Sequence, residues 1–113
     1  RFLARIDGKR YQTDFKLEGS SNYAFNLIMK EADADFAQRL MATMRETGIE
    51  FRRGSAGGGN QLRQPYLRGI VPKDHHLAFP HTEHVHFYGF YIGNFPDLRD
   101  DEIDAICRIV NAA

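Results

Sequence analysis

The sequence predicts an α+β domain in which a small, mostly antiparallel sheet has helices packed on one face. Two stretches carry apolar residues at helical spacing, and three shorter stretches have the composition and alternation of strands. They follow one another in the order strand, helix, strand, strand, helix, which is an α+β pattern. At 113 residues the chain is long enough for one hydrophobic core.

The first residues alternate between apolar and other side chains. Phe2, Ala4 and Ile6 are followed by an Asp-Gly step that suits a type I′ turn, so we expect a hairpin over residues 2–15. The chain starts at Arg1, without Met and already inside this pattern. We therefore expect it to be a piece of a longer protein.

A strand and a helix follow in the first half of the chain. Residues 23–29 have apolar side chains at every second position, which predicts a strand. Asp33 suits the N-cap of a helix, and apolar residues then recur at helical spacing as far as Gly48, which suits a left-handed C-terminal cap. Residues 49–53 are expected to form a short strand, and a glycine-rich loop comes next.

Two further elements are expected near the C-terminus. Alternation predicts a third main strand over residues 85–92, which Asn94 and Pro96 bring to an end. Apolar residues at i, i+3, i+4 and i+7 from Ile103 predict an amphipathic helix that ends near Asn111. The residues expected in the core are Phe25, Leu27, Phe36, Leu40, Met44, Phe51, Phe87, Ile92, Ile103, Ile106 and Val110.

The composition excludes several classes of protein. Fifteen Lys and Arg residues cancel fifteen Asp and Glu residues, so no overall field favours nucleic acid or an anionic membrane. No apolar run approaches the ~20 residues of a membrane span. The single cysteine, Cys107, excludes an internal disulfide and suits a reducing compartment. We therefore expect a cytoplasmic protein that binds neither nucleic acid nor a membrane, and any anion site must come from a local cluster.

All five histidines lie between His75 and His86. On the expected strand His84 and His86 share one face, and together with His81 they could supply three imidazoles to a zinc ion. No fourth ligand is evident, because Cys107 lies within the apolar stripe of the last helix. We therefore expect solvated histidines and no metal, and a zinc-binding domain remains a third class of function.

The stretch RRGSAGGGNQLRQP holds the polar groups best suited to recognising a ligand. Its arginine and amide side chains are Arg52, Arg53, Asn60, Gln61, Arg63 and Gln64. Guanidinium groups suit phosphate or carboxylate, amides suit sugar hydroxyls, and glycines let a backbone approach a ligand closely. The same residues also fit a solvated polar loop, and taken alone they do not decide between the two.

Three stretches together resemble a known family. SNYAFNLIM, GIEFRRGSAGGGNQLRQPYLR and HVHFYGFYIGNFPDLRDDEIDAIC resemble the C-terminal part of the DegT/DnrJ/EryC1/StrS family of pyridoxal- or pyridoxamine-phosphate-dependent sugar aminotransferases and dehydratases. The resemblance spans residues 20–111, and its GN…RQP loop resembles especially the members that remove a hydroxyl from nucleotide-linked keto-sugars. Arg99 is a departure, because the family often has Ser or Thr there as a helix cap, and Asp100 is expected to take that role.

The resemblance implies the small C-terminal domain of a fold type I enzyme. Residues 20–113 would form this domain, and residues 1–19 would be a hairpin or linker from a missing large domain. The large domain would hold the cofactor lysine, so this chain would bind no pyridoxal phosphate (PLP) or pyridoxamine phosphate (PMP) and would be inactive alone. The parent enzyme would be a homodimer that acts on nucleotide-linked keto-deoxysugars, as an aminotransferase or a 3-dehydratase, in the biosynthesis of cell-surface polysaccharide such as lipopolysaccharide O-antigen.

The resemblance also implies where the substrate would bind. No catalytic residue is expected in this chain, and the expected substrate-binding residues are Arg53, Asn60, Arg63, Gln64, His86 and Asn94. Arg63 and Asn60 are expected to recognise substrate and not to hold the fold, because side chains in a glycine-rich loop have few packing neighbours. The alternative is a stand-alone, non-catalytic α+β module that binds a small anion or a protein partner.

Overall fold

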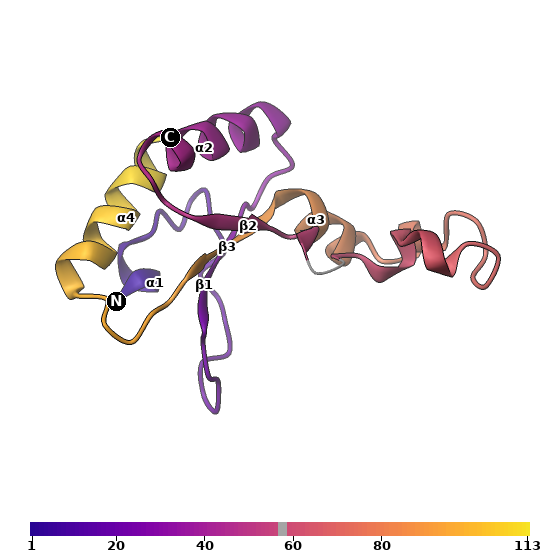
Figure 1. Cartoon of the computed structure of the whole chain (residues 1–113), viewed down its shortest axis with the longest axis horizontal. Coiled ribbons are helices and arrows are strands. Elements are labelled where there is room, and N and C mark those ends of the chain that lie inside the picture. The colour runs from indigo at the N-terminus through magenta and orange to yellow at the C-terminus, as the bar shows by residue number, and fades with distance from the viewer. Residues whose placement is uncertain (57–58) are drawn as a thin grey trace.

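The core of the molecule is a three-stranded antiparallel sheet, shown in Figure 1 from a computed structural model that describes residues 1–56 and 59–113. β3 (Gly89–Gly93) is the central strand and pairs with β1 (Ala24–Ile28) on one side and with β2 (Phe51–Arg53) on the other. The predicted α+β class with a small antiparallel sheet is therefore confirmed.

Two long helices supply the core above one face of this sheet. Leu27 lies opposite Phe90 in the register, so both side chains point to the face that packs against α2 (Ala34–Glu46) and α4 (Asp100–Ala112). Burying each large apolar side chain contributes ~1.5–3 kcal/mol before the entropy cost is subtracted. The buried core consists of Phe2, Ile6, Tyr11, Leu27, Met29, Phe36, Ala37, Leu40, Met41, Met44, Phe90, Ile92, Cys107 and Val110.

The helix predicted after Asp33 is confirmed. The Asp33 carboxylate accepts a hydrogen bond from the backbone N–H of Phe36 at 2.8 Å, which satisfies one of the free donors at the start of α2. Its apolar residues, from Phe36 to Met44, face the core as their spacing predicts. Gly48 follows the helix with a φ of 74°, the left-handed conformation expected of a C-terminal glycine.

The hairpin expected over residues 2–15 does not form. The chain instead begins with the short helix α1 (Phe2–Arg5), which packs against α4. Phe2 and Ile6 are four residues apart, so helical spacing brings both onto one face, and both are buried. Tyr11 then makes a single antiparallel bridge to Met29 beside β1. Of the three alternating residues, Phe2 and Ile6 therefore fit a helical spacing, and Ala4 between them is exposed.

The strand expected over residues 85–92 begins instead as a helix. α3 (Pro80–Tyr88) occupies the first half of this stretch, and only β3 follows the prediction. Pro80 at the first helical position suits a helix start, and the direction changes at Gly89, where a Cβ would lie 2.6 Å from a carbonyl oxygen of α3. Phe87 consequently lies on α3 and is 39% exposed, so its predicted place in the core is wrong.

The last helix starts with Arg99 as its N-cap. The backbone N–H of Arg99 donates to the Glu102 carboxylate at 2.9 Å. Asp100 is therefore the first helical residue, and the expectation that it would be the cap is wrong. Acidic side chains in the first turn also suit the positive end of the helix dipole. Cys107 is buried within α4, where its thiol is part of the packing.

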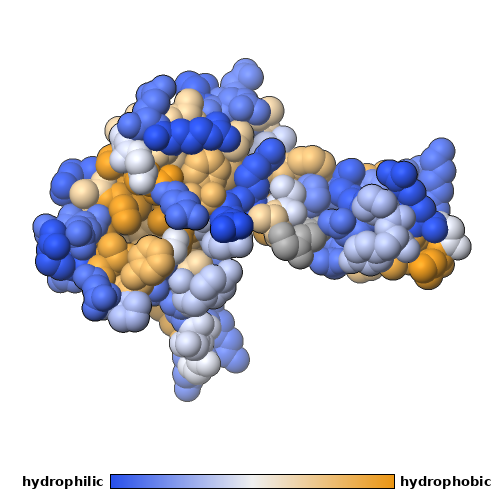
Figure 2. Space-filling model, in the orientation of Figure 1, coloured by the Kyte–Doolittle hydropathy of each residue, from blue (hydrophilic) through white to orange (hydrophobic). Residues whose placement is uncertain are grey.

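Residues 54–56 and 59–88 leave the sheet and project as an arm, which ends in α3 where the chain returns to β3 (Figure 1). Three short 3-10 helices shape it, namely η2 (Gln61–Arg63), η3 (Pro65–Leu67) and η4 (His75–Ala78). The radius of gyration is 15.3 Å, against roughly 13–14 Å for a compact domain of this length. Figure 2 shows a largely hydrophilic arm with a hydrophobic patch at its far end.

Within the described residues, no helix is long and apolar enough to cross a membrane.

Candidate functional site

Asn60 lies at the root of the arm and is 2% exposed, the one buried polar residue in the described part of the chain. Its side-chain oxygen accepts from the backbone N–H of Leu62 at 3.2 Å, which caps η2. Its amide nitrogen donates to the Glu83 carboxylate at 2.7 Å and to the carbonyl of His76 at 3.4 Å. Asn60 therefore ties the predicted loop to η4 and α3.

Glu83, in the first turn of α3, is the centre of this cluster. Besides the Asn60 amide it accepts hydrogen bonds from the Arg63 guanidinium, whose Nε lies 2.8 and 3.0 Å from the two carboxylate oxygens. The hydrogen bonds from Arg63, and after them the bond from Asn60, lower the pKa of Glu83 to about 2, against the opposing effect of burial. The Arg63 guanidinium also lies over the ring of Phe87, 4.9 Å from its centre. Glu83 is therefore ionised at neutral pH and holds the loop against α3.

His86, one turn further along α3, is joined to the same cluster through its ring. Its Nδ1 accepts a hydrogen bond from the backbone N–H of Asn60 at 2.9 Å. Gly59 lies against this nitrogen with a φ of 48°, and a Cβ there would also be 2.7 Å from the carbonyl oxygen of Gly54. The close approach thus requires glycine at position 59. Burial lowers the pKa of His86, which favours the neutral imidazole.

A groove of about 510 Å³ runs along the arm beside this cluster. This volume lies within the range of small-molecule sites, roughly 300–1,000 Å³. Leucine, valine and proline side chains supply its apolar lining, and its polar lining comes from Arg63, Gln64, Arg68, Lys73, Asp74 and His76. In the described part of the chain neither Arg68 nor Lys73 makes an ion pair, so both cations are available to an anion.

The structure brings most of the predicted site residues together. Asn60, Arg63 and His86 meet at the root of the arm, and Gln64 lines the groove beside them. Arg53 ends β2 and is close enough to His86 for its charge to affect the imidazole. Five of the six predicted site residues therefore lie in one region of the structure.

The premise that Asn60 and Arg63 do not hold the fold is wrong. Asn60 is buried, and its backbone N–H, backbone carbonyl and both side-chain polar atoms all bond to other parts of the arm. Arg63 bonds to Glu83 on α3, which is 20 residues away in the sequence. Both residues therefore shape the loop, and a change at either one is expected to lower the stability of the arm.

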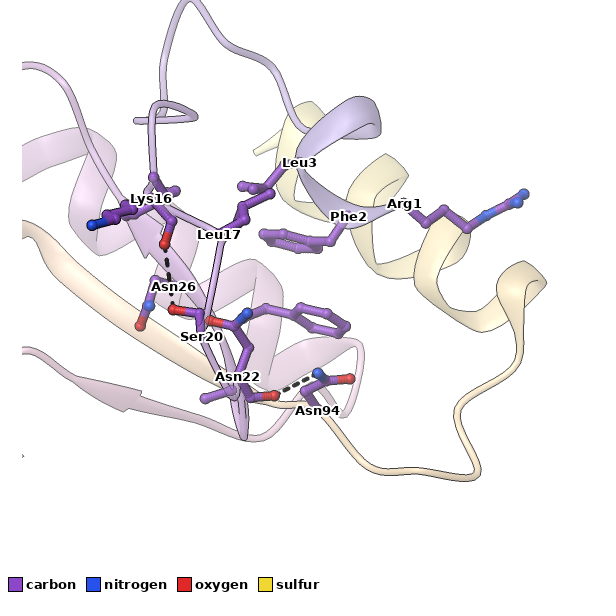
Figure 3. A pocket seen from close by; sticks show the side chains of 12 residues that line it. Arg1, Phe2, Leu3, Lys16, Leu17, Ser20, Asn22, Asn26 and Asn94 are labelled. Carbon is purple, nitrogen blue, oxygen red and sulfur yellow. Dashed lines mark hydrogen bonds between the residues drawn. The ribbon is translucent and has the colours of Figure 1, made fainter.

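Asn94 lies apart from the other predicted residues. It follows β3, and its amide donates to the carbonyl oxygen of Asn22 at 2.7 Å, at the rim of a second cavity of about 360 Å³ (Figure 3). The stacked rings of Phe2 and Phe25, 4.5 Å apart, form the apolar part of this cavity. A substrate contact from Asn94 would thus belong to a site other than the arm groove.

The histidines do not converge as a zinc site would need. Because residues 81–86 are helical, the two-residue step from His84 to His86 turns the side chains about 200° apart, where the expected strand would have aligned them. His84 bonds through Nε2 to the carbonyl of Met29 at 2.6 Å. Among the described residues, no three His, Cys, Asp or Glu side chains are grouped to hold a metal.

The sequence-based prediction missed four residues of this region. Glu83 organises the root of the arm, and Arg68, Lys73 and His76 contribute to the groove. A signal for Glu83 was present: an acidic residue three positions after Pro80 fits the first turn of a helix. Because a strand was predicted there, this signal was not recognised.

Comparison of this chain with protein-family models, with curated proteins and with solved structures gives no match.

Proposed function

We propose that this chain is the small, substrate-binding domain of a PLP- or PMP-dependent enzyme acting on nucleotide-linked keto-deoxysugars, either an aminotransferase or a 3-dehydratase. The observation that carries the proposal is the loop of residues 60–64, which is built around the buried Asn60 and forms one wall of a cation-bearing groove. The same loop carries the GN…RQP motif that resembles sugar-modifying members of the family. Cell-surface polysaccharide biosynthesis in the cytoplasm would be its setting, and the free thiol of Cys107 is compatible with that compartment.

The chemistry of the groove supports a ligand that is partly anionic and partly sugar-like. Arg68 and Lys73 offer positive charge to a diphosphate, and Gln64 has an amide of the kind that suits sugar hydroxyls. The apolar lining includes Leu62 and Leu67, which can contact the less polar faces of a sugar or base. A nucleotide sugar combines these features in one molecule.

The lysines of this chain do not fit a cofactor site. Lys9, Lys16, Lys30 and Lys73 are all exposed, whereas a lysine that forms a Schiff base with PLP is activated by burial or by a neighbouring cation. In the proposal the cofactor and its lysine belong to another domain, and this chain contributes only to binding the substrate. Its closure over the active site of a homodimer would cover the exposed apolar side chains of the arm, such as Tyr66, Ile70 and Leu77.

The proposal can be tested by titrating the chain with a nucleotide diphosphate hexose while recording ¹H–¹⁵N spectra. Saturable shifts are expected at Gln64, Arg68 and Lys73. Exchanging the groove cations, as in Lys73→Gln, should weaken binding by about tenfold, the scale of one charge-assisted hydrogen bond. Lys9→Gln is the matched control, because Lys9 is also exposed but lies away from the groove. Equal losses in the two variants, or shifts that do not saturate, would contradict the proposal.

The second candidate is a stand-alone, non-catalytic module that binds a small anion or a protein partner. The same cations and the exposed apolar side chains of the arm favour it. Inorganic phosphate separates the two functions. If phosphate binds the groove as tightly as the nucleotide sugar does, the sugar and base add nothing and the anion-binding module is the better description.

A further inference from the structure

One ring nitrogen of His86, Nδ1, is already occupied by a hydrogen bond within the protein. The backbone N–H of Asn60 donates to Nδ1 at 2.9 Å, and a donor can bond only to an unprotonated ring nitrogen. The neutral ring therefore carries its proton on Nε2. Gly59 backs the ring on its Nδ1 side, which keeps it in this orientation. Within the described part of the chain Nε2 has no hydrogen-bond partner, so its N–H is available to a ligand.

The charges around His86 preserve this neutral, donating form. Burial has the largest effect in lowering its pKa, followed by the charge of Arg63, with smaller contributions from Arg53 and His76. Glu83 is the one group that raises the pKa of His86. Because the Glu83 carboxylate already accepts hydrogen bonds from two other side chains, it does not compete for the imidazole. The result is a ring that donates without being charged at neutral pH.

Arg53 is the last residue of β2, which contacts α3, and its positive charge acts on His86. The N–H of Gly54 donates to the carbonyl of Gly89, which holds the end of β2 against the junction of α3 and β3. Arg53 is exposed, and among the described residues it has no ion-pair partner. Arg52 differs from Arg53 in two ways. Its side chain points to the opposite face of the sheet, because successive side chains of a strand alternate. Its guanidinium also lies 3.9 Å from the Glu50 carboxylate.

We propose that Arg53 and His86 form an oxyanion subsite at the root of the arm, where the guanidinium supplies the charge and the imidazole donates a hydrogen bond from Nε2. Donors alone face the ligand from these two residues, and such an arrangement selects phosphate oxygens over sugar hydroxyls. The local charge agrees: residues 53–88 contain four Lys or Arg and two Asp or Glu, although the whole chain is neutral. The inference rests on the proposed function only in assigning the oxyanion to the diphosphate of a nucleotide sugar.

The subsite is tested first in the unaltered 113-residue chain, by ¹⁵N spectra of the His86 ring at neutral pH. They should show a bare Nδ1 and a protonated Nε2, with the Nε2 signal shifting as inorganic pyrophosphate is added. Arg53→Gln should weaken pyrophosphate binding by about tenfold, and the neighbouring Arg52→Gln should leave it within about twofold. A protonated Nδ1, or equal weakening by the two arginine variants, overturns the proposal.

A pair of histidine variants separates binding from support of the fold. His86→Asn keeps an acceptor near the position of Nδ1 for the Asn60 N–H but loses the outer donor, whereas His86→Gln keeps a donor near the position of Nε2. The subsite predicts weaker pyrophosphate binding by H86N than by H86Q, and the reverse order overturns it.

A nucleotide diphosphate hexose is titrated in parallel. If it binds no better than pyrophosphate, the proposed function fails while the subsite stands; if it binds through the groove and neither Arg53→Gln nor His86→Asn weakens it, the subsite fails alone.

Discussion

Glu83→Gln should destabilise the arm at neutral pH and have little effect in acid. The pKa of Glu83 falls from an ordinary 4.5 to about 2, which corresponds to about 3 kcal/mol of stabilisation if the interaction were unscreened. Because 32% of the Arg63 side chain is exposed, solvent screening reduces the expected loss to about 1–2 kcal/mol. For a domain of this size, such a loss lowers the Tm by about 4–8 °C.

The pH dependence distinguishes this interaction from a loss of shape. Since the folded-state pKa of Glu83 lies below the unfolded-state value, its stabilisation is complete above pH 4.5 and is lost as the pH falls towards 2. The Tm difference between the parent protein and E83Q should therefore shrink steadily between pH 7 and pH 2.5, where about three quarters of the stabilisation is lost. Glu50→Gln is the control, because the Glu50 side chain is 86% exposed. A Tm difference as large at pH 2.5 as at pH 7, or no difference at pH 7, would refute the reasoning.

Three further predictions follow from the same region and from the histidines. Asn60→Ala should lower the free energy of unfolding by about 1–3 kcal/mol in denaturant titrations, because it removes the side-chain hydrogen bonds to Glu83, His76 and Leu62; a loss below about 0.5 kcal/mol, typical of an exposed residue, would contradict this. Gly59→Ala should destabilise more than Gly69→Ala, since both have positive φ but only Gly59 lacks room for a Cβ, and equal melting temperatures would contradict this. A chelator such as EDTA should leave the Tm unchanged, because the apolar core suffices for stability, and a large drop would indicate a structural metal.

Local patterns in the sequence were enough to predict the sheet-and-helix body of the protein. The stretch after Asp33 and the stretch around Ile106 carry apolar residues at a spacing that only a helix can place on one face, and both form helices. The prediction was less secure where aromatic and β-branched residues fit either period. Residues 85–88 suit a strand by alternation, yet they lie in α3, because Pro80 starts the helix and Gly89 ends it.

The sequence by itself thus determined the fold class, the two long helices and the loop on which a ligand site could be built. Only the tertiary structure decided which side chains of that loop are free for a ligand and which are used internally. Asn60 and Glu83 are 23 residues apart, and Arg63 and Glu83 are 20 apart, so no periodicity along the chain relates them. Helix and strand patterns express local geometry that repeats within a few residues. Hydrogen bonds and ion pairs depend instead on how distant segments meet. Among the described residues they leave Arg53 without an ion-pair partner and the outer nitrogen of His86 without a hydrogen-bond partner.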